Sequence, residues 1–132
     1  MKYLLIFMMI ATLYSCNTAI NKNKIEFTAS FPNNYNASIR WKRFDNLKAF
    51  IDADDYKRIS RIKKKYKDST VNSYKILLMK KITSKKYKVV LEREEVISPS
   101  NTLDTNTYLQ YWIYDEKAET WKLDSEIKDE EE

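Results

Sequence analysis

The sequence of 132 residues contains no histidine and no glycine, and it has one cysteine and two prolines. Without histidine the chain lacks the commonest general base, so a Ser-His-Asp triad and a zinc site built from Cys and His are excluded. Without glycine it lacks the turn residue of phosphate-binding and dinucleotide-binding loops. A single cysteine cannot form a disulfide within the chain. We therefore expect a protein that is not an enzyme and that uses no cofactor and no metal.

The N-terminal stretch has the order of residues found in a secretory signal. Lys2 supplies a short positive region, an apolar run follows, and the only cysteine is Cys16. The apolar stretch 3–14 has 12 residues, which span about 18 Å as a helix, whereas the hydrocarbon core of a bilayer is about 30 Å thick. This stretch is too short to cross a membrane, and we predict that residues 1–15 are a signal peptide.

The segment Leu13-Tyr14-Ser15-Cys16 resembles the lipobox of bacterial lipoproteins. Leu stands at −3, a small residue stands at −1 and Cys stands at +1, while the tyrosine at −2 is larger than usual. The resemblance implies that the Cys16 thiol carries a diacylglycerol and that palmitate or similar acyl chains anchor the protein stably. Asn17 at +2 is not the Asp that retains some lipoproteins in the inner membrane, so the resemblance favours the outer membrane, facing the periplasm or the cell surface. Ordinary secretion and an uncleaved anchor are the alternatives, and a buried structural cysteine is a further one.

Removal of residues 1–15 leaves 117 residues, the size of one domain. Residues 16–34 are polar with few apolar groups and are interpreted as a lipidated tether, onto which Ile25 and Phe27 could dock the chain. From residue 35 to residue 51 apolar groups recur at helical spacing, with a break near 43–45, where Asp45 is a candidate helix cap. An amphipathic helix follows, with Tyr56, Ile59, Ile62 and Tyr66 on one face.

After residue 70 the apolar period falls to two, which predicts four strands at 71–82, 87–97, 107–115 and 120–125. In the first strand the pattern predicts Tyr74, Ile76 and Leu78 on one face. Turns are predicted at 84–85 and 115–119, and a longer loop at 98–101. Helices followed by strands favour an α+β domain over residues 35–127, with the helices covering one face of a curved antiparallel sheet, and 128–132 form an acidic tail.

Residues 37–59 and 105–125 resemble the helical entry and the closing hairpin of uncharacterised bacterial lipoproteins with a nuclear-transport-factor-2-like (cystatin-like) domain. The resemblance rests on the Arg-Trp pair at Arg40 and Trp41, on the Gln-x-Trp strand and on the Trp-x-Leu strand that follows it. It implies a cone formed by N-terminal helices packed on a four-stranded sheet. Proteins of this fold include enzymes, ligand cups and association modules, so the resemblance does not specify an activity. Its enzymes tend to use Asp and His in the cone, and this chain has no histidine.

Aromatic side chains make up 14% of the sequence and are the candidate lining of a pocket. In a small domain such residues more often form the core. The candidates are Trp41, Tyr74, Tyr87, Tyr111, Trp112 and Trp121. The only plausible acid or base groups are carboxylates, for which surface positions are expected; they are Asp45, Asp52, Glu92 and Glu94.

Charge is unevenly distributed along the chain. Residues 36–88 contain 17 Lys and Arg against five Asp, and residues 89–132 contain four against 13 acidic residues. The basic run 57–67 is interpreted first as a solvated helix face; contact with anionic lipid headgroups or lipopolysaccharide is the alternative, and export argues against nucleic acid.

Taken with the lipobox, these patterns predict a lipid-anchored bacterial envelope protein that works by association rather than catalysis. Its predicted partners are the membrane, through the anchor, and envelope proteins or anionic lipid headgroups. The alternative is a periplasmic or cell-surface protein that binds a small apolar or aromatic ligand. An enzyme would require a carboxylate buried between helices and sheet with a raised pKa.

Overall fold

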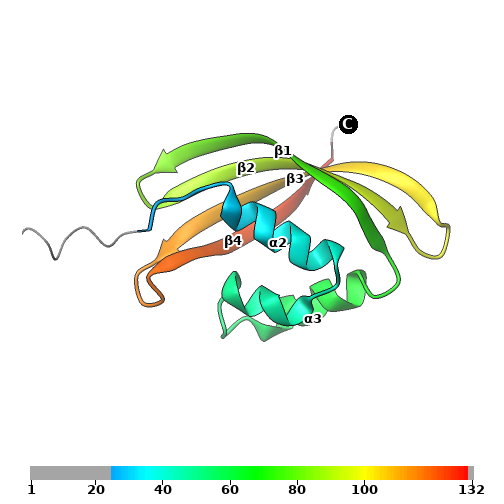
Figure 1. The fold of residues 1–132 in the computed structure, drawn as a ribbon, viewed down its shortest axis with the longest axis horizontal. Helices are drawn as coiled ribbons and strands as arrows, with labels where there is room; N and C mark the ends of the chain where they lie inside the picture. The colour runs from blue at the N-terminus through cyan, green and yellow to red at the C-terminus, as the bar shows by residue number, and fades with distance from the viewer. Residues whose placement is uncertain (1–24, 131–132) are drawn as a thin grey trace, which may run out of the picture.

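The computed structural model describes residues 25–130 as an α+β domain. The elements follow one another in the order predicted, with helices first and strands afterwards (Figure 1). They are the α-helix α2 (Ser30–Arg40), the 3-10 helix η1 (Phe44–Ala49), the α-helix α3 (Tyr56–Lys65), and the strands β1 (Thr70–Thr83), β2 (Lys86–Ile97), β3 (Thr102–Asp115) and β4 (Thr120–Asp129).

The four strands form one antiparallel sheet in the order β1-β2-β3-β4, so each strand pairs with its neighbour in sequence. The helices lie together on one side of this sheet, and the sheet curves around them (Figure 1). The connections at 84–85, 98–101 and 116–119 confirm the predicted turns. β3 begins five residues before the predicted start at 107, and β4 continues to Asp129, past the predicted end of the domain at 127.

The folded domain also begins earlier than the predicted boundary at residue 35. Phe27 is buried with 8% of its surface exposed, and α2 starts at Ser30. The predicted break between two helical pieces is confirmed, because α2 ends at Arg40 and Lys42 adopts a positive φ of 56°. Asp45 lies in the first turn of η1 and its side chain makes no capping hydrogen bond, so the predicted cap is wrong.

Helix α3 presents its apolar residues to the core less completely than the sequence pattern predicts. Ile59 and Ile62 are half-buried against the core, and Tyr66, the residue after the helix, is 2% exposed. Tyr56 is 65% exposed, so its predicted place on the buried face is wrong. Tyr56 is the first residue of α3, so its side chain lies at the end of the helix and does not reach the core.

A β-bulge at Leu77 changes which face of the sheet Leu78 occupies. Ile76 pairs with Leu91, whereas Leu78 pairs with Val90, so one extra residue separates two consecutive pairs. Because side chains alternate along a strand, one inserted residue moves those that follow to the opposite face. Leu91 points inward and Val90 points outward, so the prediction that Leu78 shares a face with Ile76 is wrong.

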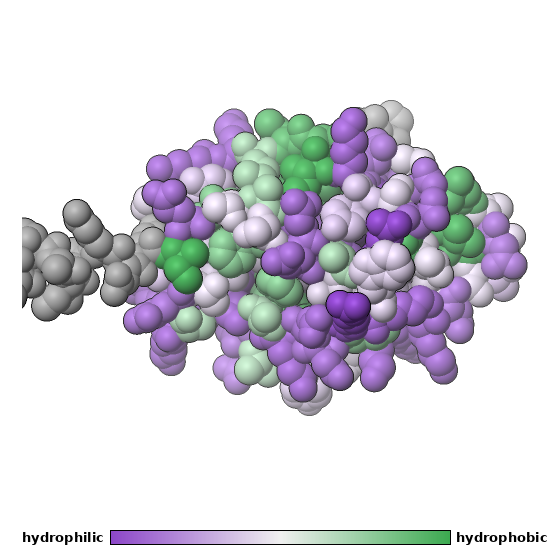
Figure 2. Space-filling view, in the orientation of Figure 1, coloured by the Kyte–Doolittle hydropathy of each residue, from purple (hydrophilic) through white to green (hydrophobic). Residues whose placement is uncertain are grey.

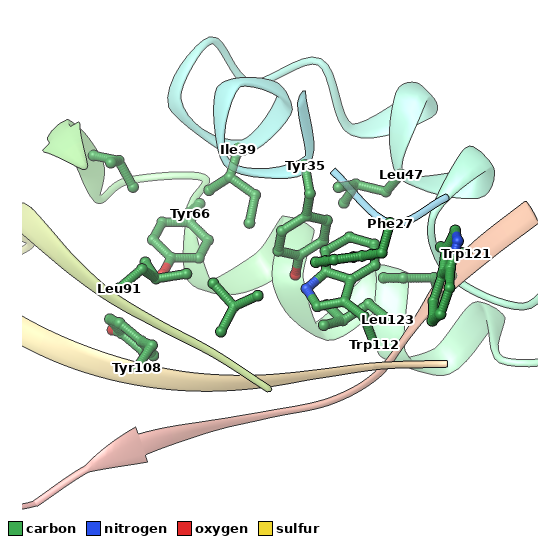
Figure 3. Close-up of a cluster of buried hydrophobic side chains, with 13 residues drawn as sticks. Phe27, Tyr35, Ile39, Leu47, Tyr66, Leu91, Tyr108, Trp112, Trp121 and Leu123 are labelled. Atoms are coloured by element: carbon green, nitrogen blue, oxygen red, sulfur yellow. The ribbon is translucent and has the colours of Figure 1, made fainter. Parts of the chain in front are cut away.

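The core lies between the helices and the concave face of the sheet (Figure 3). Trp112 from β3 is fully buried near its centre, with Phe27, Tyr35 and Trp121 around it. Many of these rings meet edge-on or tilted, the geometry that aromatic pairs prefer. The buried hydrophobic residues are Phe27, Tyr35, Ile39, Leu47, Ile51, Tyr66, Val71, Val89, Leu91, Tyr108, Trp112, Trp121 and Leu123.

The absence of glycine leaves non-glycine residues in the left-handed conformation at turns, among them Glu119, with a φ of 52°. This conformation costs a residue with a Cβ about 1–2 kcal/mol. We therefore expect Glu119→Gly to raise the free energy of unfolding by about 0.5–1 kcal/mol. Ala118→Gly in the same turn, where φ is negative, is the control and should lower it slightly; both changes are measured by urea denaturation. A loss of stability in Glu119→Gly would contradict this account of the turn.

Candidate interaction surface

The inner face of the sheet carries a buried ionic network beside the aromatic core. Arg93 of β2 is fully buried, and its guanidinium donates two hydrogen bonds to the carboxylate of Glu126 on β4, at 2.9 and 2.7 Å. It also donates to Oδ1 of Asn36 on α2, at 2.6 and 2.9 Å. The phenol of Tyr66 accepts a further bond at 3.3 Å. One side chain thus connects α2, the residue that follows α3, and β4.

The ionisation of this pair follows from its surroundings. Burial opposes the charge on Glu126, but the guanidinium of Arg93 and hydrogen bonds from Arg93 and Gln110 outweigh it, and the pKa of Glu126 is lowered. Burial likewise opposes the charge on Arg93, and Glu126 raises the pKa of Arg93 well above its ordinary value. Both groups are therefore charged near neutral pH.

A second carboxylate, Glu95, is also fully buried on β2. It accepts hydrogen bonds from the phenols of Tyr66, at 2.8 Å, and Tyr108, and from the amide of Asn106 at 3.2 Å. Burial is the main reason that the pKa of both phenols is raised above the ordinary value for tyrosine. The tyrosines therefore keep their protons and donate hydrogen bonds to Glu95. Every buried side-chain nitrogen or oxygen atom among the described residues has a hydrogen-bond partner.

A surface cavity of about 420 Å³ opens between α3 and β4, beside this network. Tyr35 and Glu126 lie at its inner end, and Arg58 and Lys65 stand on its helical wall. Both oxygens of Glu126 already accept hydrogen bonds from Arg93, and Gln110 donates to one of them at 2.6 Å. A general acid acting near neutral pH needs a raised pKa, and Glu126 has the opposite shift. The hydrogen bonds from Arg93 and Gln110 therefore keep Glu126 in its negatively charged form.

Three of the aromatic residues predicted to line a pocket lie together. Tyr87, Trp112 and Trp121 all face the helices, and the rings of Tyr87 and Trp121 meet edge-on with their centres 5.4 Å apart. Phe27 fills the space among them, with its ring centre 4.6 Å from that of Tyr87 and 5.2 Å from that of Trp121. These rings therefore pack on one another and form core.

The other three candidates lie elsewhere. Trp41 follows the end of α2, is 63% exposed and lies under the guanidinium of Arg40. Tyr74 is half-buried on β1, where its hydroxyl donates to the carbonyl of Asn33 at 3.1 Å. Tyr111 belongs to the outer face, because residues alternate along β3 and its neighbour Trp112 faces inward. The structure therefore does not gather the six predicted residues around one pocket.

The remaining predicted sites lie outside the core. Asp45 and Asp52 are exposed, and Glu92 and Glu94 are half-buried on the outer face of β2. Cys16 lies outside the described residues, so the structure does not bear on the predicted lipid attachment. The residues that sequence reasoning missed are Arg93 and Glu95, which are buried, and Glu126, whose side chain is 18% exposed. The alternation that places Leu91 inward continues to positions 93 and 95, and that continuation was the available signal.

The outer face of the sheet carries a row of apolar side chains that runs across all the strands. The residues of the row lie directly opposite one another in the register of the sheet, one on each strand. At the two edges Leu78 is 49% and Ile127 is 54% exposed. No described helix covers this face (Figure 1). We call this set the outer row; it consists of Leu78, Val90, Leu109 and Ile127.

The face of the molecule seen in Figure 2 is mostly hydrophilic, with an apolar patch at its upper edge over β1. This patch is consistent with the exposure of Leu77 and Leu78, each of which leaves nearly half of its surface accessible. Monomeric proteins rarely leave contiguous apolar patches larger than a few hundred Å² uncovered, and such patches mark sites of association. The outer row is therefore the candidate interaction surface of the domain.

Comparison of the chain with models of known protein families, with curated proteins and with solved structures finds no match. Within residues 25–130 no helix has the length and apolar character needed to cross a membrane. Across the same residues, no three acidic or cysteine side chains lie close enough together to hold a metal ion.

Proposed function

We propose that this chain is a lipoprotein of the bacterial envelope, anchored through Cys16, whose domain works by association and not by catalysis. The observation that carries the association is the outer row, an apolar strip across the whole sheet on the side away from the helices. The anchor rests on the resemblance of residues 13–16 to a lipobox. The contact surface in this proposal is the outer face of the sheet.

The filled interior supports association over ligand binding. A small-ligand cup of the nuclear-transport-factor-2-like type would need open space between the helices and the sheet. Here Trp112 is fully buried, and the rings of Phe27, Tyr35 and Phe50 lie 5.9–6.1 Å from it, measured between ring centres. A ligand of aromatic size would have to displace these rings. The order of elements and the curved sheet agree with a cone of this type, which we propose as its fold family.

The ionic network supports the same conclusion. Arg93 and Glu95, which are buried, and Glu126, which is half-buried, lie in the place where an enzyme of that fold would hold its acid or base. Their hydrogen bonds are satisfied within the protein, and Arg93 lowers the pKa of Glu126. Networks of this kind rigidify a fold and are poorly suited to exchange protons with a substrate.

The anchor is tested by labelling growing cells with radioactive palmitate. We expect label in the full-length protein and its loss in Cys16→Ala. Persistence of the label in that variant, or its absence from the parent, would contradict lipidation at this residue.

The contact surface is tested by introducing a photoreactive phenylalanine analogue at Ile127, in the outer row, or at Tyr56, on the helical side. Ile127 is 54% exposed and Tyr56 is 65% exposed, so the two positions are similarly accessible. They differ in the face of the domain on which they lie. After irradiation of intact cells we expect a discrete cross-linked product from position 127 and none from position 56. Equal yields from the two positions would contradict the assignment of the outer face.

A further inference from the structure

Along the outward side of β2 the charge changes sign across the outer row. On β2 the outward residues in sequence are Lys86, Lys88, Val90, Glu92 and Glu94. Lys88 and Glu92 each lie two residues from Val90, which places them about 7 Å to either side of the row. Along β2 the outer face is therefore basic toward the β1–β2 turn, apolar at Val90, and acidic on the other side, where Lys75 of β1 lies opposite Glu92 in the register.

We propose that the occupant of this face is a second copy of the same chain, packed face to face about a two-fold axis that runs along the outer row. Rotation by 180° about this axis turns the second sheet over and reverses the direction of its strands. The Lys88 of each copy then faces the Glu92 of the other, and the apolar row of each copy covers the other row. A two-fold interface requires such a self-complementary surface.

The same rotation brings a second pair together on β2, Lys86 against Glu94. The side chain of Asn72 already donates to Glu94 at 2.5 Å, so Glu92 is the freer acceptor of the two. On β3 the rotation places Tyr111 opposite Thr107, since these residues lie equally far from Leu109. Like charges meet only at the edge of the sheet, where Lys80 faces Lys75 on β1, and long lysine side chains there can turn into water.

The curvature of the sheet determines where the two copies meet. The sheet curves around its own helices, so the outer face is convex and the closest approach lies along its middle (Figure 1). Packed sheets lie about 10 Å apart. Apolar side chains fill this distance at the row, and the longer side chains of Lys88 and Glu92 reach across it where the sheets begin to diverge.

The mixed charge of this face argues for a second copy over an anionic membrane. Anionic headgroups would attract Lys86 and Lys88 but would be repelled by Glu92 and Glu94 at the same approach. Any partner surface of a single charge sign would likewise be attracted by one side of the row and repelled by the other. A second copy related by the two-fold axis places opposite charges together on both sides of the row. The proposal deepens the function proposed above and rests on its choice of the outer face as the contact surface.

The position of the axis is tested by cross-linking in cells that express the full-length chain. A residue on the axis faces its own copy, so Leu109→Cys should cross-link to itself with a bis-maleimide that spans about 10 Å. Tyr56→Cys, on the helical side, is the control and should give no more product than the parent chain, whose only cysteine is Cys16.

The pairing of charges is tested by reversal in the Leu109→Cys background. Each of Lys88→Glu and Glu92→Lys creates two repulsive contacts, and we expect each to reduce the dimeric product at least tenfold. The double variant Lys88→Glu/Glu92→Lys restores opposite charges and should restore the product. Lys64→Glu, an exposed change on α3, should leave it unaltered. Rescue in the double variant separates pairing from damage to the fold.

Three results would overturn the second copy as occupant. These are a Leu109→Cys chain that does not cross-link to itself, single reversals that cross-link like their parent, and a double variant that fails to recover. If these tests fail but photo-cross-linking from position 127 still gives a product, and its mass is not that of a dimer, the outer face is still a contact surface and its partner is another protein. If the protein carried no palmitate label but still formed the dimer, the proposed anchor would be wrong and the proposed dimer would be retained.

Discussion

Replacing Arg93 by Met is expected to lower the free energy of unfolding by about 3–5 kcal/mol, the cost of leaving a buried charge without its partner. The Arg93 side chain is fully buried and its ion pair with Glu126 has an N–O distance of 2.7 Å. The change also removes the hydrogen bonds to Asn36 and Tyr66, and with them the link from the sheet to α2 and to the end of α3. The measurement is urea denaturation at pH 7.

The matched control is Lys85→Met. Lys85 forms an ion pair with Glu116 in which both side chains are more than half exposed. Exposed pairs contribute about 0–1 kcal/mol, so this variant should unfold close to the parent. If Arg93→Met and Lys85→Met lost similar stability, the description of Arg93 as the buried connection between layers would be wrong.

The effect of Arg93→Met should depend on pH. Because the pKa of Glu126 is lowered from the ordinary 4.5 in the folded protein, this carboxylate stabilises the fold above about pH 4.5. That contribution is lost as the pH falls through the folded-state pKa of Glu126. In Arg93→Met the carboxylate of Glu126 has lost its ion-pair partner, so protonation of Glu126 stabilises the folded variant. The difference in unfolding free energy between parent and variant should therefore narrow in acid; a difference that stays constant down to pH 3 would contradict the pairing.

The second large effect is expected from Trp112→Ala, which should lower the free energy of unfolding by about 3–5 kcal/mol through the cavity it leaves. Trp112 is fully buried, its indole N–H donates to Gln110 at 3.1 Å, and four other aromatic rings surround it. Removal of the indole therefore has two effects: it leaves a cavity, and the side-chain oxygen of Gln110 loses one hydrogen-bond donor.

Trp41→Ala provides the control, because it removes the same side chain from a position that is 63% exposed. Its contact with Arg40 is worth about 0.5–1 kcal/mol at most, so the two tryptophan variants should differ several-fold in their effect on stability. Thermal or urea denaturation measures both. A small loss in Trp112→Ala would mean that the space between helices and sheet is loosely filled, and a ligand cup would then become the better function to propose.

The general architecture was predictable because it depends on local patterns. The change from helical spacing to alternation near residue 70, and the polar turns at 84–85 and 116–119, follow from short-range preferences of the chain. A break between two helical pieces was predicted near residues 43–45 for the same reason, and it lies just before them, at Lys42. The face occupied by Leu78 was not predictable in this way, because a bulge at Leu77 has no marker such as glycine in this sequence.

The face that each charged residue of β2 occupies follows from alternation, but the partners it meets there were not predictable from local pattern. Glu94 and Glu95 are adjacent and chemically identical, yet Glu94 lies on the outer face and Glu95 is fully buried. Alternation along β2 turns position 95 inward, and the partners that satisfy the buried carboxylate there come from other segments, Tyr66, Tyr108 and Asn106. The predicted acid or base groups therefore included Glu94 and left out Glu95, the carboxylate that is buried.

The amino-acid sequence by itself determined which chemistry is missing, the order of helices and strands, and the positions of the turns, because composition and short-range periodicity are properties of the chain alone. Only the tertiary structure decided that Arg93 and Glu126 form a buried pair and that four apolar residues line up across the outer face. Both depend on the register between strands, which brings together residues far apart in sequence and is set by the packing of the whole domain.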